Sequence, residues 1–289
     1  MEFRMLQYFL AVVREENISR AADTLHITQP TLSRQMAQLE EELGTQLFIR
    51  GKHLSLTEAG ILLRRRAEEM NELLSKIEQE IEQQSEVGGV ISIGSGGLLA
   101  VQVLPKIMEA FREQYPNVQY QIYTNSADHV KERLEQGLLD FGLLLEPIDV
   151  TRFDYIRMKE RERWGLFMRY DHPLAGREKI TREDLLTTPL AVTDRLSIQK
   201  ELESWLGLEF SQLNIFAYYN IVDNAIWLTD QGIAPLLTIE GAISRLEGER
   251  FVFRPVEPEL SMTSVLAWKK FQPHSGAAGK FLEFLRAFL

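Results

Sequence analysis

The sequence predicts three successive parts: an all-α N-terminal domain, one long helix, and an α/β C-terminal domain. Apolar residues recur at helical spacing through residues 3–43. An a/d heptad pattern then runs over residues 63–81, and from Val90 short apolar strands alternate with amphipathic helices. A chain of 289 residues is long enough for two or three domains, each with its own core.

Composition limits the classes of function. The net charge is -10, and residues 1–60 hold six Lys or Arg against eight Asp or Glu, which argues against a nucleic-acid partner unless basic residues are concentrated where contact is made. The chain has no cysteine, which excludes disulfides, thiolate catalysis and cysteine-ligated metals. No apolar run reaches the roughly 18 to 20 residues of a membrane span, and the first residues lack a signal-peptide pattern, so a cytoplasmic location is expected.

The first 44 residues predict three helices. Ser19 is expected to be the N-cap of the second helix and Thr28 the N-cap of the third, which should end at Gly44. The third helix has an apolar stripe at spacings of four, three and four residues. This stripe consists of Leu32, Met36, Leu39 and Leu43.

The opposite face of the third helix is polar in its N-terminal half, and its acidic residues 40–42 lie at the far end. Such side chains can reach base edges or phosphates in a DNA groove. The candidate DNA-binding residues of this helix are Thr28, Gln29, Pro30, Thr31, Ser33 and Arg34. A solvated helix face is the alternative, because two helices joined by a short turn occur in many proteins that do not bind DNA.

The segment "AADTLHITQPTLSRQMAQLEEELGTQLFIR", Ala21 to Arg50, resembles the signature of LysR-type transcriptional regulators almost position for position. The resemblance implies a winged helix-turn-helix DNA-binding domain over residues 1–58, with a β-wing from Leu47 to Leu56. Arg50 and Lys52 would contact phosphates or the minor groove. The stretch "IRGKHLS" is about one residue shorter than the commoner wing of the family.

Residues 59–88 are expected to form a long linker helix with an apolar seam. The seam consists of Leu63, Ala67, Met70, Leu74, Ile77 and Ile81. The stripe could pack on the chain's own sensor domain, but two-fold proteins commonly read paired DNA half-sites, and this helix dimerises members of the resembling family. A homodimer or homotetramer is therefore expected.

The remaining chain reads as alternating strands and helices with a mostly parallel sheet, and such sheets bind ligands where strands end and helices begin. Ser95, Gly96 and Gly97 follow the first strand, and Asn125 and Ser126 follow the second. Backbone N–H groups and hydroxyls there would bind a polar or anionic group of a ligand.

This region also resembles the sensor domain of LysR regulators, an α/β domain of periplasmic-binding-protein type with two lobes. The resemblance implies an effector-binding domain over residues 89–289, with lobe I at 89–145 and 264–289 and lobe II at 146–263. Thr193 and Arg195 follow the predicted strand "PLAV" of lobe II and should reach the same cleft, where Tyr219 or Asn220 could also face the effector. Arg195 could pair with a carboxylate of the effector, and a solvated loop arginine is the alternative for that residue. Double-stranded DNA, a small-molecule effector and RNA polymerase are the expected partners.

Two other classes of function are compatible with parts of the sequence. Gly94-Ser95-Gly96 suggests a dinucleotide-binding enzyme, but the third glycine would fall at Leu99 and no acid follows the second strand. There is no G-x-S-x-G motif, and the five histidines show no metal-ligand spacing, so no catalysis, metal or cofactor is expected. The other alternative is a small-molecule binding protein whose helical N-terminus only mediates assembly. Binding to an operator would distinguish a regulator from that alternative, and turnover of a substrate would identify an enzyme.

Overall fold

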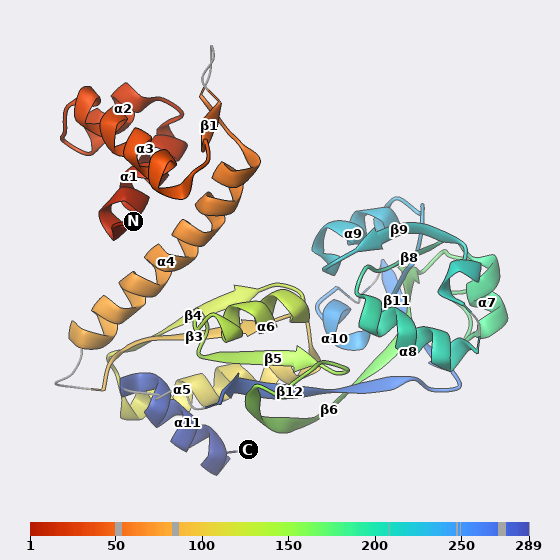
Figure 1. Ribbon diagram of the computed structural model, residues 1–289. Helices are drawn as coiled ribbons and strands as arrows, with labels where there is room; N and C mark the ends of the chain where they lie inside the picture. The colour runs from red at the N-terminus through yellow and green to blue at the C-terminus, as the bar shows by residue number, and fades with distance from the viewer. Residues whose placement is uncertain are drawn as a thin grey trace. The chain divides into compact units, whose positions relative to one another are not determined.

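The computed structural model describes residues 1–49, 54–82, 87–207, 209–246, 248, 250–270 and 276–288. Within helix α4 the side chains at 76 and 79–82 are outside this description. The chain forms two compact units, Met1–Glu82 and Gln83–Leu289 (Figure 1). No helix of the described ranges is both long and apolar enough to cross a membrane.

The first unit is a small helical domain. Its elements are α1 (Phe3–Glu15), α2 (Ile18–Thr24), α3 (Gln29–Leu43), β1 (Phe48–Ile49), β2 (Ser55–Leu56) and α4 (Glu58–Glu82). Helix α3 begins after its N-cap Thr28 and ends at Gly44 in the left-handed conformation, as predicted. The N-cap of α2 is Asn17 and not Ser19, because the Asn17 side chain accepts hydrogen bonds from the amides of Ser19 and Arg20 at 2.9 and 3.0 Å.

Strands β1 and β2 pair antiparallel at the two ends of the predicted wing and form its base. Glu40 fixes this base, since its Oε1 accepts hydrogen bonds from the amides of Leu47 and Phe48 at 2.7 and 3.2 Å. At the start of α4, a Cβ on Gly60 would overlap the Leu47 carbonyl oxygen, so glycine is required for this close approach. Arg50 and Lys52, the two predicted wing contacts, lie outside the described residues.

The second unit has two lobes. Lobe I contains β3 (Gly89–Ser95), η1 (Leu99–Val103), α5 (Leu104–Gln114), β4 (Val118–Thr124), α6 (Ala127–Glu135), β5 (Phe141–Leu145), β12 (Ser261–Lys269) and α11 (Gly276–Phe288). Lobe II contains β7 (Ile180–Thr181), α7 (Arg182–Thr187), β8 (Leu190–Thr193), α8 (Leu196–Leu206), η2 (Phe210–Gln212), β9 (Ile215–Tyr219), α9 (Val222–Asp230), β10 (Leu236–Ile239), α10 (Glu240–Ile243) and β11 (Phe251–Glu257).

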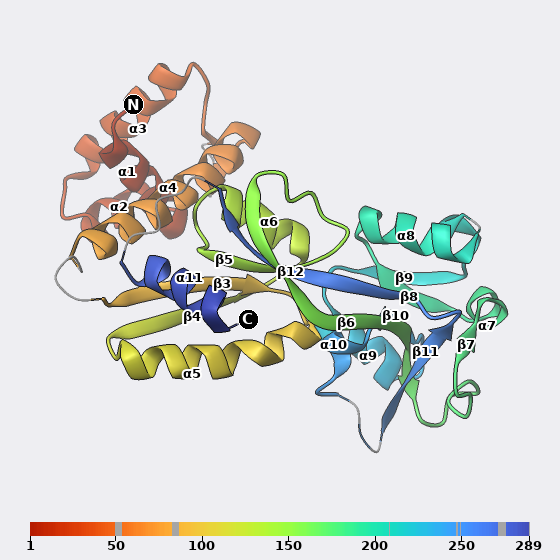
Figure 2. The same cartoon turned by 90° about the horizontal axis from the view of Figure 1, so that it is seen from below.

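The 17-residue strand β6 (Phe153–Arg169) joins the two lobes (Figure 2). The strand order β4-β3-β5-β12-β6-β10-β8-β9 is continuous, because β6 pairs with β12 up to Arg163 and with β10 from Trp164 onward. Residues 146–163 therefore belong with lobe I, and the expected change of lobe at residue 146 is wrong. The return strand also begins at Ser261, earlier than the expected Ser264. The physical reason is that the lobes are joined within a strand, which has no loop signal in the sequence.

Close packing of α6 on the sheet explains why residue 94, the first of the "GSG" segment, is glycine. A Cβ on Gly94 would lie 2.6 Å from Leu139 Cδ1 and 2.7 Å from Val130 Cγ1. Below this contact the buried Asp140 carboxylate accepts hydrogen bonds from the Ser92 amide at 2.8 Å and hydroxyl at 2.7 Å, which fixes β3 against β5. Gly94 thus serves packing, and the backbone beyond it turns toward the cleft.

Candidate functional site

The polar face of α3 is open to solvent, with Thr28, Gln29, Pro30, Thr31 and Arg34 exposed and Ser33 half-buried. The opposite face buries Leu32, Met36 and Leu39 in the helical core. The Thr28 and Thr31 hydroxyls are 2.7 Å apart and share a hydrogen bond. Arg34 makes no hydrogen bond or ion pair with any other described residue, so its guanidinium is available to a partner outside the chain.

Helix α4 runs from Glu58 to Glu82, residues 83–86 of the expected 59–88 helix lie outside the described residues, and Val87 and Gly88 are not helical. Two predicted seam residues face inward: Ala67 is 1% exposed, and Leu63 packs on the core of the same unit. The assignment of Ala67 to a seam between chains is therefore wrong, whereas the half-buried Leu63 keeps part of its surface open. Met70 and Ile77 are exposed and Leu74 is half-buried, whereas the side chain of Ile81 lies outside the described part.

Exposed apolar residues on α4 form a stripe, which we call the α4 outer stripe. It consists of Leu62, Met70, Leu73 and Ile77. At 100° per residue these positions lie on one side of the helix, rotated from the predicted seam. A row of large exposed apolar side chains on an otherwise charged helix is typical of an interaction surface.

A cavity of about 660 Å³ lies between the two lobes. All seven predicted effector residues line it: Ser95, Gly96, Gly97, Asn125, Ser126, Thr193 and Arg195. Ser95 ends β3 and Ser126 lies between β4 and α6 in lobe I, and Thr193 ends β8 in lobe II. The parallel strands of each lobe therefore bring their carboxyl ends to this one space.

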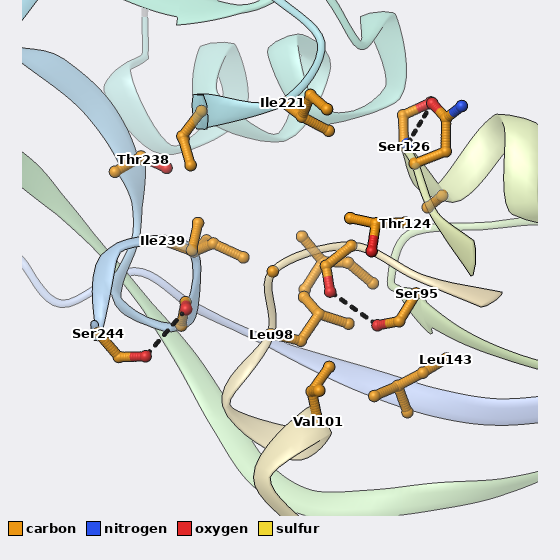
Figure 3. A pocket seen from close by; sticks show the side chains of 18 of the residues that line it. Ser95, Leu98, Val101, Thr124, Ser126, Leu143, Ile221, Thr238, Ile239 and Ser244 are labelled. Carbon is orange, nitrogen blue, oxygen red and sulfur yellow. Dashed lines mark hydrogen bonds between the residues drawn. The ribbon is translucent and has the colours of Figure 1, made fainter. Parts of the chain in front are cut away.

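The hydroxyls of the cavity come from both lobes (Figure 3). Ser95 Oγ donates to the Gly96 carbonyl at 2.7 Å, and Ser126 Oγ lies 2.8 Å from His129 Nδ1. The Ser126 amide, expected to be open to a ligand, donates instead to Asn125 Oδ1 at 2.8 Å. Thr193 Oγ1 accepts the Arg195 amide at 3.2 Å and so shapes the start of α8.

Arg195 is neither a solvated loop residue nor an unpaired cation. Its side chain is 7% exposed, and three of its donors are used within the chain. Nε donates to Asp128 Oδ2 at 3.2 Å, Nη1 to the Leu145 carbonyl at 3.0 Å and Nη2 to the Pro147 carbonyl at 2.9 Å. Burial lowers the pKa of Arg195, and the nearby Asp128 carboxylate opposes this effect. The residue therefore joins lobe II to lobe I at the cavity wall.

The apolar part of the cavity wall was not predicted as part of the site. Leu98, Val101 and Met108 contribute from lobe I, and Ile198 and Ile239 from lobe II. Their helical and strand spacing indicates core, and a wall shared between core and cavity has the same pattern in sequence. Tyr219 and Asn220 also line the cavity, and the Tyr219 hydroxyl donates to the Leu237 carbonyl at 2.9 Å.

Known families match both units of the chain. The family described as "LysR substrate binding domain" matches residues 84–289, and "Bacterial regulatory helix-turn-helix protein, lysR family" matches residues 3–61. The chain belongs to the LysR family of transcriptional regulators. It is a DNA-binding regulator with an effector-binding domain, as the resemblance of residues 21–50 predicted.

Full-length relatives agree with this assignment. The LysR chain is 30% identical over 282 residues to the Hca operon transcriptional activator HcaR of Escherichia coli (strain K12), with 93% of this chain and 92% of HcaR covered. It is 32% identical over 284 residues to the regulator AlsR of Bacillus subtilis (strain 168), with 93% and 91% covered.

Solved structures show the same fold. CbnR, a LysR family transcriptional regulator, matches with a TM-score of 0.76 at 23% identity over 99% of each chain. Full-length BenM matches with a TM-score of 0.55 at 26% identity over 100% of this chain and 96% of BenM. The two-lobed α/β fold with an N-terminal winged helix-turn-helix and a linker helix is thus the fold of LysR regulators.

Proposed function

We propose that the exposed N-terminal half of α3 reads an operator and that a small molecule in the cavity between the lobes controls this regulator. The observation that carries the proposal is that residues from both lobes meet around one cavity of about 660 Å³, a size suited to a small metabolite. A ligand that contacts both lobes biases their relative arrangement, and through it the DNA-binding heads of the assembly.

The cavity chemistry supports an effector with a polar end and an apolar body. The hydroxyls of Ser95, Ser126 and Thr193 would bind the polar end, with Gly96, Gly97 and Asn125 shaping the loops around it. The first turn of α6 adds backbone N–H groups, which favour an anionic group. Arg195 would contribute to the wall and not as the main counter-ion, because its donors already bind within the chain.

On the DNA side, Thr28, Gln29, Pro30, Thr31, Ser33 and Arg34 would contact the operator. Arg50 and Lys52 would add phosphate or minor-groove contacts from the wing. The α4 outer stripe would pair two copies of the chain into a homodimer, the unit from which a tetramer could be built. We infer that such an assembly works in the cytoplasm with RNA polymerase as a further partner and without catalytic activity.

The test begins with the operator. Sites bound by the native protein would be mapped on genomic DNA, and metabolites made or used by the neighbouring gene products would then be screened for a change in operator affinity. A compound that acts should lose its effect in Ser126→Ala/Thr193→Val, while operator affinity without it stays near wild type. The matched control is Ser211→Ala/Thr187→Val, at exposed lobe II positions outside the cavity wall.

An unchanged response in the cavity variant at the same compound concentration would place the effector site elsewhere. If the native protein bound no DNA site selectively, the assignment of α3 as the reading helix would be wrong. Each arm thus tests a separate part of the proposal.

A further inference from the structure

Glu162 is a buried carboxylate at the point where β6 passes from one lobe to the other. Its exposed fraction is 0%, and the next residues, Arg163 and Trp164, are those at which the pairing of β6 changes from β12 to β10. Burial of an acidic side chain is costly unless strong hydrogen bonds hold it. The bonds that Glu162 makes therefore indicate what the residue does.

The two oxygens of this carboxylate bind opposite lobes. Oε1 accepts a hydrogen bond from the Leu99 amide of lobe I at 2.5 Å, and Oε2 accepts one from the Gly241 amide of lobe II at 3.2 Å. Both amides lie in the first turn of a short helix, η1 or α10, and neither helix has a capping side chain at its N-cap residue. One carboxylate thus caps two helices that belong to different lobes.

Both capped helices adjoin walls of the cavity. Leu99 directly follows the Ser95–Leu98 segment, and Gly241 begins the segment that contains Ala242 and Ser244. These two segments also touch each other: a Cβ on Gly97 would lie 3.0 Å from Ala242 Cα, and a Cβ on Gly241 would overlap both the Leu99 amide and Glu162 Oε2. The approach requires glycine at position 241, and a Cβ at position 97 would be tight against Ala242.

Among the residues that the structure describes, no cation is paired with Glu162. Glu240, at the start of α10, is the nearby charge that acts on Glu162, and it is paired with Arg163 at 2.8 Å. Helix η1 carries no titratable side chain, and the residue opposite Glu162 on β12 is Met262. Burial accordingly raises the pKa of Glu162 to about 7, although the amides of Leu99, Gly241 and Ala100 act in the opposite direction.

We propose that Glu162 is a positioning residue of the effector pocket, whose carboxylate holds the lobe I wall Ser95–Leu98 against the lobe II wall that begins at Gly241. The pocket assignment rests on the function proposed above, whereas the link between the walls is a property of the chain alone. Loss of one acceptor oxygen releases one wall, so the arrangement of the lobes becomes heterogeneous.

The distance between the lobes tests this directly. The chain has no cysteine, so spin labels can be attached at exposed Glu109 of α5 and Asn224 of α9 after both are changed to cysteine. Pulsed electron resonance on the full-length protein at about pH 8.5, where the Glu162 carboxylate is ionised, without effector or DNA, should give one narrow distance distribution. Glu162→Gln should add a second population, because the Gln amide can accept only one of the two N–H groups and presents a donor to the other.

Asp140→Asn is the matched control, a buried carboxylate whose Ser92 partner lies in the same lobe. It should lower stability but leave the distance distribution unchanged. Should Glu162→Gln fail to fold, Glu162→Asp keeps the charge and is one methylene shorter, so it too should release one wall. A folded Glu162 variant with the wild-type distribution would overturn the proposal. Because no effector is added, that result would leave the operator and effector tests unaffected.

Discussion

The guanidinium of Arg195 in lobe II lies 3.2 Å from the carboxylate of Asp128 in lobe I. The two partners differ in burial, since the Arg195 side chain is 7% exposed and that of Asp128 is 60% exposed. Exposed ion pairs contribute little, whereas buried groups that lose their hydrogen-bond partners are costly. Most of the stabilisation by Arg195 should therefore come from its hydrogen bonds to the carbonyls of Leu145 and Pro147.

The first prediction follows from that difference in burial. Arg195→Met should lower the free energy of unfolding of the sensor unit by about 2 kcal/mol, because the buried Leu145 carbonyl and the half-buried Pro147 carbonyl lose their donors. Asp128→Asn should cost less than about 1 kcal/mol. Urea unfolding of the two variants beside wild type measures both values. Equal losses would mean that the ion pair, and not the carbonyl contacts, holds Arg195.

The second prediction concerns pH and Glu162. Its pKa is raised from 4.5 to about 7 in the folded chain, so the folded state holds the proton more tightly than the unfolded state. The stabilisation is fully present below pH 4.5 and is lost as pH rises through about 7. At about 1.4 kcal/mol per pKa unit, the loss is about 3 kcal/mol.

Urea unfolding between pH 4.5 and 8 would show this loss as a fall in the stability of wild type relative to Glu162→Gln, which cannot titrate there. Parallel curves for wild type and Glu162→Gln would show that Glu162 has an ordinary pKa.

The third prediction concerns DNA recognition by α3. Arg34→Ala should weaken operator binding by about 1 to 3 kcal/mol and leave folding intact, because the side chain is exposed and has no partner among the described residues. Arg14→Ala, an equal change of charge on α1, is the control, since Arg14 is exposed and pairs with the adjacent Glu15. Fluorescence anisotropy at matched salt measures both affinities. Equal losses of operator affinity in the two variants would show that Arg34 contributes only its positive charge.

The fourth prediction concerns the wing. Arg50→Ala should weaken binding to operator and to unrelated DNA alike, and should flatten the dependence of affinity on salt by about one phosphate contact. Affinity measured over a salt series on both DNAs provides the readout. A loss confined to the operator would show that Arg50 reads bases.

The fifth prediction concerns the α4 outer stripe. Met70→Asp with Ile77→Asp should break the assembly, because the new charges would face an apolar partner surface. The control Asn71→Asp with Ser75→Asp adds the same charge at exposed positions on another side of α4. Sedimentation should show a smaller species for the first variant alone. If the stripe variant kept the wild-type mass, the contact between chains would lie elsewhere.

The sequence alone determined what depends on local interactions. Helix α3, its N-cap Thr28 and its end at Gly44 follow from spacing and capping preferences that act within a few residues. The strand ends at Ser95 and Ser126 could be placed in a common cleft because parallel strands end at one edge of a sheet. The family followed from residues 21–50, where a long contiguous motif is specific.

Tertiary structure decided what depends on contacts distant in sequence. Ala67 faces inward because α1 packs against α4, which the heptad pattern cannot show. Arg195 looked like a solvated loop residue because its partners, Asp128, Leu145 and Pro147, lie about fifty to seventy positions away. Glu162 has no local signal at all: its role comes from Leu99 and Gly241, 63 and 79 residues distant, which only the fold brings to the two oxygens of one buried carboxylate.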